Sequence, residues 1–228
     1  MKVVDRIVSA LLSLGVIIAA FFAPLIHWVY QITVYGLANN LLGSLTGQYI
    51  GNANDQGITE DDMSLYNIYD MLKGFGVNMK DLFFGEREPN VSTEILVPLV
   101  KPVIIFFALT LVIALVAMFV SIFSNAKKTQ MAIGACGIVS LILLKSSFDK
   151  LVAPIIDGRV TLGGLLDIPF LGLITKVDVV NLSGGWVMML MLFIGLILWS
   201  LSYILTSEKE TETIKKKQPK SIKKGKKA

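Results

Sequence analysis

Four long apolar stretches constrain the fold of this chain more than any other feature. The stretches without acidic or basic side chains cover residues 7–54, 102–126, 129–144 and 179–207. About 20 helical residues cross the ~30 Å hydrocarbon core of a bilayer. Backbone in lipid must satisfy its own hydrogen bonds, which favours helices. The pattern predicts an all-α integral membrane protein, a four-transmembrane-helix bundle with spans at about residues 5–30, 96–123, 129–147 and 185–206.

Composition supports this class and limits the chemistry. Of the 228 residues, 54% are hydrophobic and 17% are charged; a soluble domain has about 45–50% apolar and about 25% charged residues. A single cysteine, Cys136, excludes an intramolecular disulfide, and a single histidine, His27, excludes multi-histidine metal sites. We expect one membrane domain at residues 1–207, followed by a tail at 208–228, and no cofactor.

Charge predicts the orientation of the spans. The segment from Gly36 to Val100 carries nine acids against three basic residues, whereas Lys127 and Lys128 link the second and third spans. Removing the eight lysines of the tail takes the formal charge from +4 to −4. Because positively charged flanks stay cytoplasmic, we expect a multi-pass plasma membrane protein with both termini inside and loops 36–95 and 148–184 outside.

The two outer loops differ in character. In the first, Thr59 followed by three acids resembles a helix start, and Lys73-Gly74 resembles a helix end, so we expect a small helical cap. In the second, apolar residues alternate with Gly and Pro between Val160 and Val180. Short strands and a membrane-skimming segment are both compatible with that pattern.

Small residues in the third span predict close helix packing. Residues 132, 136 and 140 recur every fourth position, and two glycines lie beside them. Small side chains let helix backbones approach closely in lipid, and an apolar setting keeps a thiol inert. The expected packing residues are Ala132, Gly134, Cys136, Gly137 and Ser140.

Lys101 and Lys145 are the charges deepest in the predicted spans. From Lys128 to Lys145 is 17 residues, or about 26 Å of helix at about 1.5 Å per residue, which places Lys145 at the outer interface. Two interpretations apply: a small basic site for an anionic ligand, or snorkelling lysines with no ligand. We favour the second, with Lys145 paired to Asp149 four residues on.

The tail is lysine-rich, polar and free of aromatic residues, so we expect it to be disordered. Next to a membrane it should be attracted to anionic lipid headgroups or to an acidic partner, with no specific nucleic acid. The lysines concerned are Lys215, Lys216, Lys217, Lys220, Lys223, Lys224, Lys226 and Lys227.

In number of spans, larger first outer loop and inward termini, the chain resembles claudin and tetraspanin-like four-span proteins. Its first loop lacks the tryptophans and paired cysteines of those families, so no residue role is transferred. Glycosylation sequons begin at Asn90 and Asn181, and no phosphate-binding, metalloprotease or serine-hydrolase motif occurs. We therefore expect a non-enzymatic accessory subunit or scaffold that binds protein partners or its own copies. The alternatives are an oligomeric small-solute channel or transporter, and a membrane-embedded enzyme acting on lipid or peptide.

Overall fold

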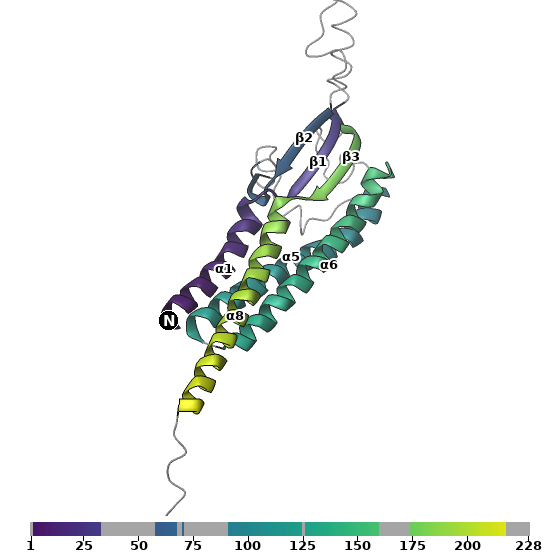
Figure 1. Cartoon of the computed structure of the whole chain (residues 1–228). Coiled ribbons are helices and arrows are strands. Elements are labelled where there is room, and N and C mark those ends of the chain that lie inside the picture. The colour runs from purple at the N-terminus through teal and green to yellow at the C-terminus, as the bar shows by residue number, and fades with distance from the viewer. Residues whose placement is uncertain are drawn as a thin grey trace, which may run out of the picture.

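The computed structural model describes residues 2–32, 58–67, 70, 91–124, 126–159 and 174–217, and within them four long helices and a three-stranded sheet dominate. The helices are α1 (Lys2–Phe22), α5 (Val91–Phe123), α6 (Lys127–Ile156) and α8 (Gly184–Lys217), and the strands are β1 (Ile26–Ile32), β2 (Ile58–Met63) and β3 (Ile174–Leu182) (Figure 1). Each helix contains a segment long and apolar enough to cross a membrane. This architecture is consistent with a multi-pass membrane protein.

The helices form a bundle in which successive members run in opposite directions, with the sheet at one end (Figure 1). We call this the sheet end. We call the other end, where α1 begins and the α5–α6 link lies, the base. Helix α1 contacts α5 and α8, and α6 contacts the same two helices, so the four close a ring. The fully buried core includes Val16, Ala114, Leu141, Met189 and Phe193.

Glycines set the closest helix contacts. A Cβ atom added to Gly137 would lie 2.5 Å from the Phe193 ring, and one added to Gly134 would lie 2.8 Å from Ile197. Since real Cβ atoms keep a larger distance, α6 and α8 approach each other because these positions lack side chains. Gly15 of α1 faces Leu192 of α8 in a similar, looser contact.

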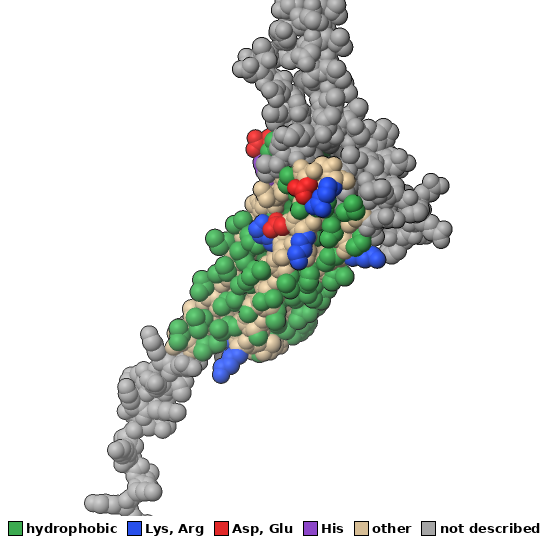
Figure 2. All heavy atoms as spheres, turned by 90° about the vertical axis from the view of Figure 1, so that its right-hand side faces the viewer, with side chains coloured by type: hydrophobic (Ala, Val, Ile, Leu, Met, Phe, Trp, Pro, Cys, Tyr) green, Lys and Arg blue, Asp and Glu red, His purple; other side chains and the backbone are tan. Residues whose placement is uncertain are grey.

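The outside of the bundle is apolar. Large side chains such as Ile105, Phe119, Ile142 and Met191 are more than half exposed. Figure 2 shows hydrophobic side chains covering the helices between charged side chains at the two ends. In water, so wide an apolar belt would favour aggregation, whereas hydrocarbon solvates it.

The sheet joins the two predicted outer loops. Its order is β2-β1-β3 with both pairs antiparallel: Trp28 of β1 lies between Asp61 of β2 and Val180 of β3. Hydrogen bonds from Leu25 N–H to Met63 O (2.8 Å) and from Ser183 N–H to Leu25 O (2.8 Å) continue the pairing to the helix ends. The sheet is therefore fastened to the bundle at the top of α1 and α8.

The sheet corrects the all-α prediction and the end of the first span. We expected a helix to residue 30, but α1 ends at Phe22 and residues 26–32 form β1. Pro24 disfavours helical backbone at Ala23 and cannot donate a backbone hydrogen bond. The following Ile-His-Trp-Val-Tyr-Gln-Ile run is rich in β-branched and aromatic residues, which suit a strand.

The helix predicted to begin at Thr59 is also wrong in its first residues, because residues 58–63 form β2. Helical residues begin at Leu65, and the Ser64 hydroxyl accepts the Asn67 N–H at 3.1 Å. Ser64 is thus the N-cap in place of Thr59. The predicted helix end at Lys73-Gly74 lies outside the described residues.

Helices α6 and α8 extend beyond the ends predicted for the third and fourth spans. In the second loop, α6 continues to Ile156 and β3 covers Ile174–Leu182, whereas residues 160–173 lie outside the described residues. Residues 208–217, expected to be disordered, continue α8 to Lys217. Glu and Lys, which dominate this segment, are good helix formers. The rest of the tail lies outside the described residues.

Candidate functional site

A buried ion pair lies inside the base of the bundle. Lys127 Nζ is 2.6 Å from Asp5 Oδ2, and the two side chains are only 3% and 5% exposed. Asp5 comes from the first turn of α1 and Lys127 is the first residue of α6. The other carboxylate oxygen of Asp5 accepts the indole N–H of Trp199 at 2.7 Å. The pair therefore joins three helices.

Gln130 connects this pair to the remaining helix. Its amide oxygen lies 2.9 Å from Lys127 Nζ and accepts the hydroxyls of Ser9 and Ser200 at 3.3 Å each. Its amide nitrogen donates to the Ser121 hydroxyl of α5 at 3.4 Å. Three donors converge on one oxygen, which settles the orientation of the amide. We call the connected side chains the base network: Asp5, Ser9, Ser121, Lys127, Gln130, Trp199 and Ser200.

The base network satisfies its charges inside the protein. Taking an ammonium and a carboxylate out of water costs several kcal/mol per ion, which only close pairing and further hydrogen bonds offset. Lys127 has a carboxylate, an amide oxygen and the Ser9 hydroxyl (3.2 Å) around it, and its Nζ lies 5.3 Å from the centre of the Tyr203 ring. Together, the contacts of the base network hold the four helices in one arrangement.

Sequence reasoning missed the base network because Lys127 was interpreted only as a charge in the link between two spans. A signal was available in the first span. Asp5, Ser9 and Ser13 recur every fourth residue, which puts three polar side chains on one helix face. All three are buried in the structure. A polar stripe along an apolar span indicates the side that faces other helices.

The residues of the predicted packing stripe separate onto two sides of α6. Gly134, Gly137 and Ser140 are buried, and the Ser140 hydroxyl lies 2.9 Å from the Thr110 hydroxyl of α5. Ala132 and Cys136 are exposed. The packed face repeats at intervals of three and four residues, 130-134-137-141-144, as helix geometry requires. Residues that are spaced strictly four apart do not all stay on that face.

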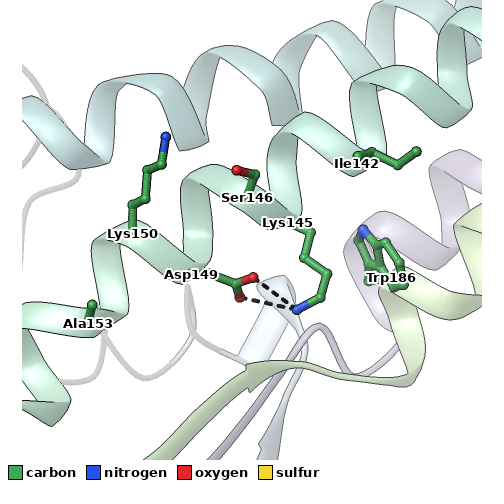
Figure 3. A pocket seen from close by; sticks show the side chains of 7 residues that line it. All are labelled: Ile142, Lys145, Ser146, Asp149, Lys150, Ala153 and Trp186. Carbon is green, nitrogen blue, oxygen red and sulfur yellow. Dashed lines mark hydrogen bonds and ion pairs between the residues drawn. The ribbon is translucent and has the colours of Figure 1, made fainter.

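The two predicted outer basic residues lie at the sheet end without forming one site. Lys101 of α5 is exposed. Lys145 of α6 pairs with both carboxylate oxygens of Asp149, at 3.1 and 3.2 Å, and borders an open groove that Trp186 also lines (Figure 3). The groove holds Lys150 but not Lys101.

A polar cluster lies on the sheet itself. His27 Nδ1 is 3.1 Å from Asp62, and its Nε2 is 3.4 Å from Glu60, both on β2. Ser183, just before α8, donates its hydroxyl to Asp62 at 3.1 Å. The carboxylates approach opposite nitrogens of the ring, so they do not converge on one ion. Among the described residues, no group of three His, Cys, Asp or Glu side chains is placed to hold a metal.

Two other groups of predicted residues can be located in part. Lys215, Lys216 and Lys217 belong to the last turn of α8, and Lys220, Lys223, Lys224, Lys226 and Lys227 lie outside the described residues. Of the two sequons, Asn181 is an exposed residue of β3 and Asn90 is not described.

In comparisons with known proteins, no protein family, no curated protein and no solved structure matches this chain.

Proposed function

We propose that the protein is a non-enzymatic, multi-pass protein of the plasma membrane that binds other proteins, as an accessory subunit or a scaffold. Both termini lie in the cytoplasm and the sheet lies outside. Charge supports this orientation: Lys127 and Lys128 belong to the base, whereas Glu60, Asp61 and Asp62 belong to the sheet end. The tail lysines contact anionic lipid headgroups of the cytoplasmic leaflet.

The observation that carries the proposal is the way the sheet is attached. Strands from both outer segments pair with β1, one on each side of it, and backbone hydrogen bonds join their ends to Leu25, which lies just after α1. A Cβ atom on Gly185 would lie 2.7 Å from Pro24 O, so α8 starts directly against the α1–β1 junction. The bundle thus presents a small, firmly held platform, which we call the outer platform: β1, β2 and β3.

The outer platform has the features of a contact surface for a protein. The flanking strands β2 and β3 are the two outer members of the described sheet order. Outer strands of a sheet can pair with an extended segment of a partner. Glu60 extends from β2 with 70% of its side chain exposed. In the base network, by contrast, the charged side chains face each other inside the bundle.

Affinity purification tests the proposal. The tagged full-length chain is extracted from its own membrane in a mild detergent, and co-purifying proteins are quantified by mass spectrometry. We expect at least one partner at a stoichiometric amount, or a defined oligomer of the chain. Glu60→Arg should lower partner recovery several-fold, whereas Lys128→Gln, an exposed residue at the base, should leave it unchanged.

A clean monomer without a stoichiometric partner would contradict the proposal. Unchanged recovery with Glu60→Arg would remove the outer platform as the contact surface. The thermal stability of both variants must match that of the unmodified chain, so that a recovery difference reports binding and not unfolding.

A second candidate function is an oligomeric channel or transporter for small solutes. The Asp5–Lys127 pair favours it, because ionisable groups inside membrane bundles often mark ion or substrate paths. Flux into liposomes that contain the purified protein decides between the two. Transport that is lost in Asp5→Asn while the fold is retained would establish this function, and no flux across a broad solute panel would exclude it.

A further inference from the structure

The outer part of α6 carries a polar face within an otherwise apolar surface. Together with Trp186 of α8 it lines an open groove of about 580 Å³ (Figure 3). The α6 residues of the groove recur at helical intervals of three and four and therefore share one face. They are Ile142, Lys145, Ser146, Asp149, Lys150 and Ala153.

The groove lies at the depth of lipid headgroups. Lys145 and Lys150 follow Lys127 by 18 and 23 residues, which is about 27 and 35 Å of helix at about 1.5 Å per residue. A hydrocarbon core is about 30 Å thick, with headgroups beyond it. The α6 surface changes at this level. Val139, Ile142 and Leu143 are exposed apolar residues, and Ser146, Asp149 and Lys150, which follow in the groove, are exposed polar residues.

The charges of the groove match a phosphate diester. Lys145 and Lys150 extend from opposite edges of the face, with Ser146 and Asp149 between them (Figure 3). Asp149 neutralises Lys145, with which it pairs, so the groove has a net charge of +1. Among the described residues, the Lys150 ammonium has neither an ion pair nor a hydrogen bond. Ser146, one helical turn before it, adds a hydroxyl donor.

Trp186 supplies the aromatic part of the site. Its indole N–H donates to the Leu141 carbonyl of α6 at 3.0 Å, which holds the ring against α6. Tryptophan favours the interface between hydrocarbon and water. The ring and Ile142 thus provide apolar surface next to Lys145, as an amphiphile with a charged head requires.

We propose that this groove binds a glycerophospholipid from the leaflet on the sheet side. The phosphate lies against Lys150 and Ser146, Lys145 adds positive charge from the other edge of the face, and the acyl chains run down α6 along Ile142, Leu143 and Val139. This assignment is independent of the protein-binding function, since a bound lipid requires no partner protein. It also gives Lys150 a counterion.

Binding of short-chain lipids to the purified full-length protein tests the assignment. Native mass spectrometry measures the affinity for dioctanoyl phosphatidylglycerol in the unmodified chain and in Lys145→Gln/Lys150→Gln. We expect the double variant to bind at least about tenfold more weakly, because it removes the Lys150 donor and both positive charges of the groove. Lys145→Arg/Lys150→Arg should retain binding. Lys101→Gln, which removes an exposed lysine from α5, should leave the affinity unchanged.

The ligand arms distinguish a lipid from a free anion. Dioctanoylglycerol, which lacks the phosphate, should bind at least tenfold more weakly than the phospholipid, and inorganic phosphate at millimolar concentration should not displace it. Equal phospholipid affinity in the unmodified chain and the double glutamine variant would overturn the proposal. So would an equal loss in Lys101→Gln, or displacement by inorganic phosphate alone. Matching melting temperatures of the variants exclude unfolding as the cause of a loss.

Discussion

The base and the sheet end of the bundle use the same ion-pair chemistry in opposite surroundings. At the base, Lys127 and Asp5 are 3% and 5% exposed, and five further side chains complete the base network. At the sheet end, Lys145 and Asp149 are 41% and 51% exposed. An exposed pair gains little because water solvates each charge equally well. Removing one partner of a buried pair leaves a charge without solvent. We therefore expect the base to determine helix arrangement and the sheet end to remain available for binding.

The largest expected effect comes from unpairing the buried carboxylate. Lys127→Ala should lower the free energy of unfolding by about 3–5 kcal/mol, measured by thermal or denaturant unfolding in detergent. Its neighbour Lys128, which is exposed, serves as the control, and Lys128→Ala should change stability by less than about 0.5 kcal/mol.

A double variant sharpens this comparison. Asp5→Leu/Lys127→Met removes both charges and should recover most of the stability lost in Lys127→Ala, since replacing a whole buried pair by apolar residues is often neutral. A loss in the double variant as large as the loss in Lys127→Ala would show that the unpaired charge is not the cause.

Two tryptophans give a second matched pair. Trp199→Phe at the base removes an N–H donor to a carboxylate and should cost about 1.5–3 kcal/mol, whereas Trp186→Phe at the sheet end removes a donor to a backbone carbonyl and should cost about 0.5–1.5 kcal/mol. The reverse order of melting temperatures would refute the idea that the base dominates stability.

Glycine substitutions compare the middle of the bundle with its sheet end. In Gly137→Ala, the new methyl would meet the Phe193 ring at 2.5 Å, which should cost about 1–3 kcal/mol by overpacking. Gly184→Ala is the control, because nothing lies within 4 Å of a Cβ at that position. Equal unfolding midpoints for the two variants would mean that α6 and α8 separate easily.

The smallest effect is expected at the exposed pair. Lys145→Gln should lower stability by only about 0.2–0.5 kcal/mol, and high salt should reduce even this difference. Unfolding curves at low and high ionic strength measure it. A loss comparable to that of Lys127→Ala would erase the distinction between the two ends.

Hydropathy alone located the four helices, because crossing hydrocarbon imposes a length and a composition that few other structures share. The sheet was harder to predict. Residues 26–32 continue the apolar run of the first span, and their strand partners lie far along the chain, at residues 58–63 and 174–182. A local pattern carries no information about such pairing. Pro24 and the β-branched and aromatic residues after it were the local signs of a change from helix to strand.

The base network shows a different limit of sequence reasoning. Lys127 lies beside Lys128, and the two lysines together are well explained as a signal of membrane orientation. That interpretation gave no reason to expect that Lys127 is buried. Whether a charge at a span end faces water or the bundle depends on how the helix is rotated. The polar face of Asp5, Ser9 and Ser13 shows which side of α1 turns inward, but the partners of this face come from two other helices, α6 and α8.

Because β1 is the middle strand, the described sheet cannot be completed until β3 has been synthesised. Strand β1 is made before β3, with which it pairs, so Ile26 must wait for Leu182 to emerge from the ribosome. At about 5–20 residues per second, the intervening chain takes roughly 8–30 s to synthesise. During that interval one edge of β1 lacks its final neighbour, so a nascent chain stalled after α6 would display an open strand to chaperones and proteases.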